Sequence, residues 1–248
     1  MRPEPIQVLQ AGTRRPPSTA SARAVLMAGA TGALGNEMLR RLAGSGRHGV
    51  LRVLAGEPIT QALRGVECVV VPPEIDGDWP LIPAQTGVIL FEPPQLFYDR
   101  ERALWTPRPD QFRPLAGWMR TCGVTTLVVV LPHTQGGLPE ALKRGLASLD
   151  EQAVAALGFD VVLFVRSAQK PRAVAPGGVL PGVAHWMLSV LRYMVPSSEQ
   201  PVRAARLAEL VELALRVAPP GIHVAAPELV WRAVQGNLQA AVDAWLVR

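Results

Sequence analysis

The chain has 248 residues, 49% of them hydrophobic, and its 25 basic against 20 acidic side chains leave a net charge of +5. This length favours one sizeable α/β core over two equal domains, and no apolar run reaches the ~18 uncharged residues of a membrane span. The positive charge is scattered and almost all arginine, without the dense basic helix and interleaved aromatic residues that mark a nucleic-acid surface. Composition therefore argues against a membrane span and against a nucleic-acid partner.

The first 22 residues are rich in proline and arginine. We expect residues 1–22 to form a flexible arm and residues 23–248 to form a single domain, with a smaller substrate or cap region in 166–248. The arm lacks the apolar centre of a secretory signal, and Cys68 and Cys122 lack the spacing of a metal site or disulfide framework. The sequence thus predicts a cytoplasmic protein with buried thiols and no metal.

A glycine-rich turn follows the first apolar run. Residues 24–28 lead into Gly29-Ala30-Thr31-Gly32-Ala33-Leu34-Gly35, and the next residues show an apolar helical stripe, which is the order strand, turn, helix. Gly29 permits the tight turn, Gly32 lets the backbone approach a pyrophosphate, and Gly35 lets the helix pack close to the strand. Free N–H groups at the start of the helix then face the phosphates. The pattern predicts a dinucleotide site, with a structural turn as the alternative. The predicted cofactor-binding residues are Gly29, Thr31, Gly32, Ala33, Leu34 and Gly35.

Strands and helices alternate along the rest of the chain. Apolar, β-branched runs bounded by glycine or proline predict the strands, and apolar residues at helical spacing predict the helices. This alternation predicts an α/β fold with a doubly wound parallel sheet in the order 3-2-1-4-5-6 plus a seventh strand. The predicted strands after the first are 49–55, 66–71, 87–91, 124–131, 159–165 and 222–225, and the main helices are 109–121, 139–157, 183–194, 202–217 and 227–247.

The end of the second strand bears on the choice of cofactor. Sites that prefer NAD place an acid there for the ribose hydroxyls, whereas sites that prefer NADP place an arginine there for the 2′-phosphate. Ala55-Gly56-Glu57 matches neither pattern, so the sequence leaves NADP and NAD open. Tyr98 follows the fourth strand, where loops overhang a nucleotide, and it is either a ligand contact or a half-buried loop tyrosine.

With these elements in place, the chain resembles the atypical and extended short-chain dehydrogenase/reductases, especially the NmrA-like and Tat-interacting-protein-like members. The residues that carry the resemblance are the glycine turn at 29–35 and the segments 63–69, 123–128 and 157–166. The resemblance implies an NAD(P)-binding Rossmann fold. It also implies a catalytic tyrosine with a lysine further along the same helix, and a serine at the end of the fifth strand.

The sequence departs from that pattern at each catalytic position. His133 or Thr134 stands where the serine is expected, while Lys143 falls at the tyrosine position and Ala147 at the lysine position. The chain's two tyrosines, Tyr98 and Tyr193, lie elsewhere and do not rebuild the pair. Lys170, in the loop after the sixth strand, is either near the nicotinamide end of the pocket or an exposed loop lysine.

Two functional hypotheses follow from these departures. The first is a catalytically degenerate protein that binds NAD(P), or only keeps the fold, and acts as a sensor, assembly factor or interaction module with a protein partner. The second is an active NAD(P)H-dependent oxidoreductase or isomerase acting on a small molecule, with His133, Thr134, Tyr98 or Lys170 as non-standard catalytic groups. A histidine suits that role because its ordinary pKa lies near neutrality.

Overall fold

The computed structural model describes residues 24–59, 65–75, 79–92, 94, 99–131, 148–166 and 204–246. The arm at 1–22, the predicted helix 183–194 and the first part of the predicted helix 139–157 lie outside this range, as does most of the loop after the sixth strand.

A seven-stranded sheet forms the centre of the fold, in the order β3-β2-β1-β4-β5-β6-β7. All of its strand pairs are parallel. This is the doubly wound, Rossmann-like sheet that the sequence predicts, with the seventh strand added next to the sixth. The strands are β1 (Val25–Ala28), β2 (Leu51–Ala55), β3 (Val66–Val70), β4 (Thr86–Leu90), β5 (Thr126–Leu131), β6 (Val161–Arg166) and β7 (Gly221–Ala225).

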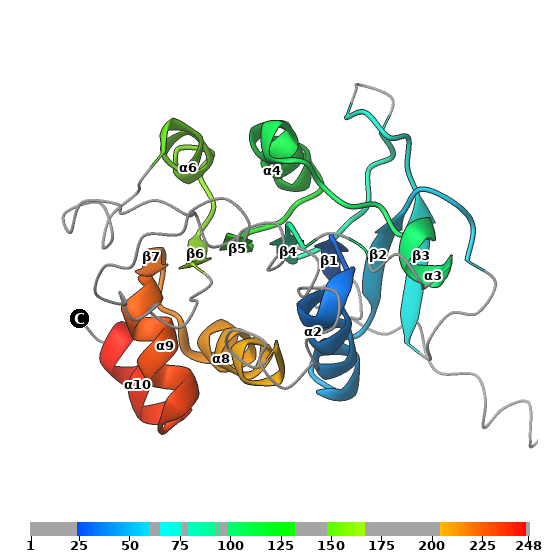
Figure 1. Ribbon diagram of the computed structural model, residues 1–248. Coiled ribbons are helices and arrows are strands. Elements are labelled where there is room, and N and C mark those ends of the chain that lie inside the picture. The colour runs from blue at the N-terminus through cyan, green and yellow to red at the C-terminus, as the bar shows by residue number, and fades with distance from the viewer. Residues whose placement is uncertain are drawn as a thin grey trace, which may run out of the picture.

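Helices cover both faces of the sheet, α4 and α6 on one side and α2, α8, α9 and α10 on the other (Figure 1). A short helix and a 3₁₀ turn lie in the connection from β4 to α4. The helices are α2 (Gly32–Gly44), α3 (Asp99–Ala103), η2 (Pro109–Gln111), α4 (Phe112–Thr121), α6 (Leu149–Ala155), α8 (Ala204–Val217), α9 (Pro227–Gln235) and α10 (Leu238–Leu246). No helix of the described part of the chain is long and apolar enough to cross a membrane.

The core has two halves because successive strand residues point to opposite faces. Val25 and Met27 of β1 pack toward α2 and α8, whereas Leu26 and Ala28 pack toward α4. Strands covered on both faces are apolar throughout, which is why these segments read as continuous hydrophobic runs rather than as alternating ones.

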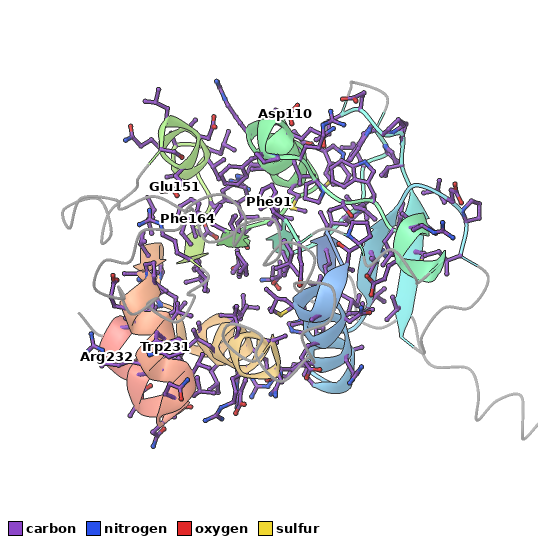
Figure 2. The ribbon with its side chains drawn as sticks, viewed as in Figure 1. Phe91, Asp110, Glu151, Phe164, Trp231 and Arg232 are labelled. Atoms are coloured by element: carbon purple, nitrogen blue, oxygen red, sulfur yellow. The ribbon has the colours of Figure 1, made fainter. Side chains whose placement is uncertain are left out.

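On the α4 side, three phenylalanines form a row of edge-to-face contacts. The ring centroids of Phe91 and Phe112 are 5.7 Å apart, and those of Phe112 and Phe164 are 6.4 Å apart. Figure 2 shows Phe91 and Phe164 on this side of the sheet, with Glu151 on α6 near Phe164. The Glu151 carboxylate accepts a hydrogen bond of 2.9 Å from the Arg166 guanidinium, and both side chains are 6% exposed. This buried ion pair joins α6 to the carboxyl end of β6.

On the opposite side, α8 packs beside α2. The apolar faces of both helices belong to one core cluster, including Met38 and Leu42 of α2 and Leu210 of α8. Arg41 of α2 lies 3.6 Å from Glu209 and 3.5 Å from Glu212 of α8. Segments from the two ends of the chain are thus held together by apolar packing and an ionic cluster.

Three predictions need correction. The helix predicted over 139–157 does not run through Ser148, whose backbone is extended and whose hydroxyl caps the start of α6, and Leu149, expected to face inward, is exposed. The closing segment predicted as one helix over 227–247 is two helices, because the backbone leaves helical geometry at Gly236. Asn237 precedes α10, and its Oδ1 accepts from the Ala240 N–H at 3.2 Å. The thiols were predicted to be buried; both are free, and Cys122 is buried, but Cys68 of β3 is half-buried. Burial raises the pKa of the Cys122 thiol, partly offset by a hydrogen bond from the Ile82 N–H.

Candidate functional site

The glycine turn lies at the carboxyl end of β1, in the middle of the sheet, and leads directly into α2. Gly29 and Gly32 have φ angles of +78° and +70°, a region that favours glycine. A Cβ at Gly35 would lie 2.6 Å from the carbonyl carbon of Ala30, so this glycine permits the close packing of the helix against the turn. The turn therefore has the backbone geometry expected of a phosphate-binding loop.

The N–H groups at the start of α2 donate to two glutamates of the chain itself. The Gly32 N–H donates to Glu101 Oε2 at 3.0 Å, and the Leu34 N–H donates to Glu92 Oε2 at 2.7 Å. Glu92 follows β4, and Glu101 belongs to α3, where it is 4% exposed. Two carboxylates thus occupy the helix end that the sequence predicts for phosphates, where both the free N–H groups and the helix dipole favour negative charge.

Polar neighbours hold the two glutamates in this position. Thr31, the residue before α2, does not cap the helix with its own hydroxyl and instead donates to the backbone carbonyl of Glu92. Its Oγ1 also lies 3.3 Å from the hydroxyl of Thr106. The Asn36 amide donates to the Gly32 carbonyl at 2.8 Å and to the second oxygen of Glu101. The first turn of α2 is therefore capped by side chains distant in the sequence and not by Thr31, the residue that precedes it.

The Glu92 carboxyl is held in an environment that disfavours its charge. Burial raises the pKa of Glu92 above its ordinary value, and the neighbouring Glu101 carboxylate adds to the rise. Hydrogen bonds from the backbone N–H groups of Leu34, Ala33 and Gly35 oppose the rise without cancelling it. A second anion brought to this helix end would meet the same burial and the same repulsion.

A segment of the chain crosses the carboxyl ends of β1 and β2. We call residues 101–107 the crossing segment; it comprises the end of α3 and the residues that follow (Figure 1). Leu104 forms an antiparallel bridge with Ala55, the last residue of β2. The backbone of Trp105 accepts from the Gly29 N–H at 3.2 Å and donates to the Leu54 carbonyl at 3.0 Å. The edge of the sheet beside the glycine turn is thus covered by hydrogen-bonded backbone.

The crossing segment also covers the position where a dinucleotide ribose binds in this class of sheet. The N–H groups of Gly56 and Glu57 both donate to the Ala103 carbonyl, at 2.8 and 3.2 Å. Glu57, the acid nearest to a ribose ligand in the sequence, is exposed. The residues present therefore do not fit NAD or NADP in this arrangement: carboxylates hold the phosphate donors, and the ribose edge is covered.

The predicted catalytic candidates cannot be placed relative to this site. His133, Thr134, Tyr98 and Lys170 lie outside the described residues, as do Lys143 and Ala147. The predicted cofactor-binding residues Gly29, Thr31, Gly32, Ala33, Leu34 and Gly35 are all described and come together at the turn. Among the described residues, no cluster of three or more His, Cys, Asp or Glu side chains is placed to hold a metal ion.

Sequence reasoning missed the two residues that dominate this site. Glu92 carried a signal, since an acid directly after a strand that neighbours β1 lies at the same sheet edge as the glycine turn. Glu101 carried none, because it lies in a five-residue helix and reaches Gly32 across 69 positions of the chain. Asn36 was also missed, although it stands one residue after the glycine turn and faces Glu101.

The sequence matches no protein-family model and no curated protein. The fold is similar to a nucleoside-diphosphate-sugar epimerase from Staphylococcus aureus, with a TM-score of 0.49 and 13% identity over 82% of this chain and 71% of that one. It is also similar to the enzyme WbmG from Bordetella bronchiseptica, solved with NAD and UDP, with a TM-score of 0.43 and 13% identity over 87% and 79%. For the ADP-L-glycero-D-manno-heptose-6-epimerase from Helicobacter pylori the TM-score is 0.45, with 11% identity over 91% and 85%. The ligands and reactions named for these enzymes belong to those enzymes.

Proposed function

We propose that this chain is a short-chain dehydrogenase/reductase-like Rossmann protein that serves as a binding, sensor or assembly module and not as an oxidoreductase. Its ligand class on this proposal is a nicotinamide dinucleotide, NADP or NAD, which binds only when Glu92 and Glu101 release the N–H groups of α2. The glycine turn supports the ligand class, because Gly29 and Gly32 adopt the backbone conformation that such turns use beside a pyrophosphate.

The observation that carries the non-catalytic role is the capture of the α2 N–H groups by Glu92 and Glu101. An oxidoreductase that exchanges its cofactor in every cycle needs those donors available to the phosphates. The sequence adds a second argument, since residues 132–160, between β5 and β6, contain no tyrosine to donate a proton. Without a general acid, hydride transfer loses about 10²–10⁴-fold in rate.

The test combines binding with turnover. The fluorescence of NADH and of NADPH is titrated with the full chain, and the same samples are then screened with carbonyl compounds and nucleotide sugars. We expect weak binding and no turnover. Turnover that His133→Ala abolishes would overturn the proposal in favour of the active oxidoreductase with a non-standard acid.

A further inference from the structure

We infer that the carboxylates of Glu92 and Glu101 substitute for a pyrophosphate in this chain, and that they compete with any dinucleotide for the amino end of α2. The inference rests on the proposed function and deepens it, because it names what regulates the binding site. It follows from three features of the described residues: which donors are taken, which space is filled, and which charges face one another.

The donors are the first feature. A phosphate at the start of a helix accepts from N–H groups of the first turn, and here the Gly32 and Leu34 N–H groups already have acceptors at 3.0 and 2.7 Å. Each backbone N–H has a single hydrogen to donate, so a phosphate oxygen and a carboxylate oxygen exclude each other at these positions. A ligand phosphate can bind at the start of α2 only if Glu92 and Glu101 no longer accept from these N–H groups.

The filled space is the second feature. A Cβ built on Gly32 would lie 2.3 Å from Cδ and 2.7 Å from Oε2 of Glu92. The glutamate side chain therefore runs directly over the α-carbon of Gly32. That is the surface which a glycine at this point of the turn leaves bare for a pyrophosphate. A glycine is therefore required at position 32 because any larger residue would clash with the Glu92 side chain.

The charges are the third feature. When both are ionised, Glu92 and Glu101 bring the same number of negative charges to the helix end as the pyrophosphate bridge of a dinucleotide. The two acids repel each other, and the N–H groups of Gly32 and Leu34 and the Asn36 amide offset this by donating to the two carboxylates. A pyrophosphate added to the pair would double the negative charge in a half-buried place, which strongly disfavours simultaneous occupancy.

The experiment measures the binding of inorganic pyrophosphate by titration calorimetry at constant ionic strength. The proteins compared are the wild type, Glu92→Ala, Glu92→Ala/Glu101→Gln and, as the control, Glu67→Ala. Glu67→Ala is a matched control because it replaces glutamate by alanine and changes the net charge by the same amount. Glu67 lies on β3, away from the glycine turn; its side chain is 58% exposed and pairs with Arg52. Circular dichroism establishes that each variant is folded.

We expect Glu92→Ala to bind pyrophosphate at least about tenfold more tightly than the wild type, because both the space and the donors are freed. The double variant should bind about tenfold more tightly again, since the remaining carboxylate charge is gone. Glu67→Ala should match the wild type. Equal affinity of the wild type and Glu92→Ala, or no binding by a folded double variant, would overturn the inference.

If Glu92→Ala does not fold, Glu92→Gln keeps the shape of the side chain and removes only its charge. It should bind pyrophosphate more tightly than the wild type, and affinity equal to that of the wild type would overturn the inference. The proposed function fails separately. Turnover by the wild type would refute the proposed function. The order of pyrophosphate affinities among the variants tests only the role of Glu92 and Glu101.

Discussion

Gly32→Ala should destabilise the fold by about 2–5 kcal/mol, through two costs of different origin. The φ angle of +70° is one at which an L-residue costs about 1–2 kcal/mol. The added Cβ would also lie 2.3–2.4 Å from Cδ and Cγ of Glu92, so the glutamate has to be pushed aside, and overpacking of this kind costs about 1–3 kcal/mol. The upper and lower limits are the sums of these two ranges.

A double-mutant cycle with Glu92→Ala separates the two costs. Without the glutamate side chain, Gly32→Ala should cost only its backbone part, so the coupling between the two positions should be about 1–3 kcal/mol. Urea unfolding followed by tryptophan fluorescence measures each variant, because Trp79 and Trp105 are buried and report on the fold. Effects that add within about 0.5 kcal/mol would show that Glu92 does not lie over Gly32 in solution and would refute this reasoning.

Glu92→Gln should melt at a higher temperature than the wild type at pH 8, and the difference should vanish near pH 4. The folded pKa of Glu92 lies above its ordinary value of 4.5, so the stability that its protonated form provides is present below that value and is lost as the pH rises through the folded pKa. Arg166→Met should cost about 3–5 kcal/mol, because it leaves the buried Glu151 carboxylate without this guanidinium. Gly35→Ala should cost about 3 kcal/mol or more, because its Cβ would lie 2.6 Å from backbone that cannot swing away as a side chain can.

Each of these outcomes has its own measurement and control. Thermal unfolding from pH 4 to pH 8 follows Glu92→Gln, and a wild type that gains stability over the variant as the pH rises would contradict the direction of the pKa shift. Urea unfolding follows the other two. Gly44→Ala is the control for Gly35→Ala, since a Cβ there meets nothing within 4 Å, and it should leave stability unchanged or slightly higher. A loss below about 1 kcal/mol for Arg166→Met, as expected of an exposed pair, would show that its ion pair is solvated.

Local pattern was sufficient for the sheet and insufficient for the short helices. The strands were predicted because β-branched apolar runs such as 126–130 stop at glycine or proline, and their order followed from the alternation with helices. The helix Asp99–Ala103 was missed because five residues are too few to show a helical period. The single closing helix was wrong because the apolar spacing continues past Gly236, although the backbone does not.

At the candidate site, too, the local backbone could be predicted from the sequence, but the contacts from distant residues could not. The conformation of the glycine turn is local, so the positions of Gly29 and Gly32 could be predicted. Which groups accept from the N–H donors of the turn depends on residues 58 and 69 positions away, namely Glu92 for Leu34 and Glu101 for Gly32. A contact of that separation depends on how the connection after β4 folds back. The position of Glu92 after a neighbouring strand was the one sequence signal for it, and Glu101 had none.

The pairing of α2 with α8 has a consequence for how the chain is made. Arg41 and Glu212 are 171 positions apart, so at a synthesis rate of about 5–20 residues per second a nascent chain waits roughly 10–30 s between making one helix and making the other. During that interval the side of α2 that faces α8, including part of its apolar surface, lacks α8 to cover it. Chains that stall before residue 204 should therefore be captured by chaperones or aggregate, even though their first strands are complete.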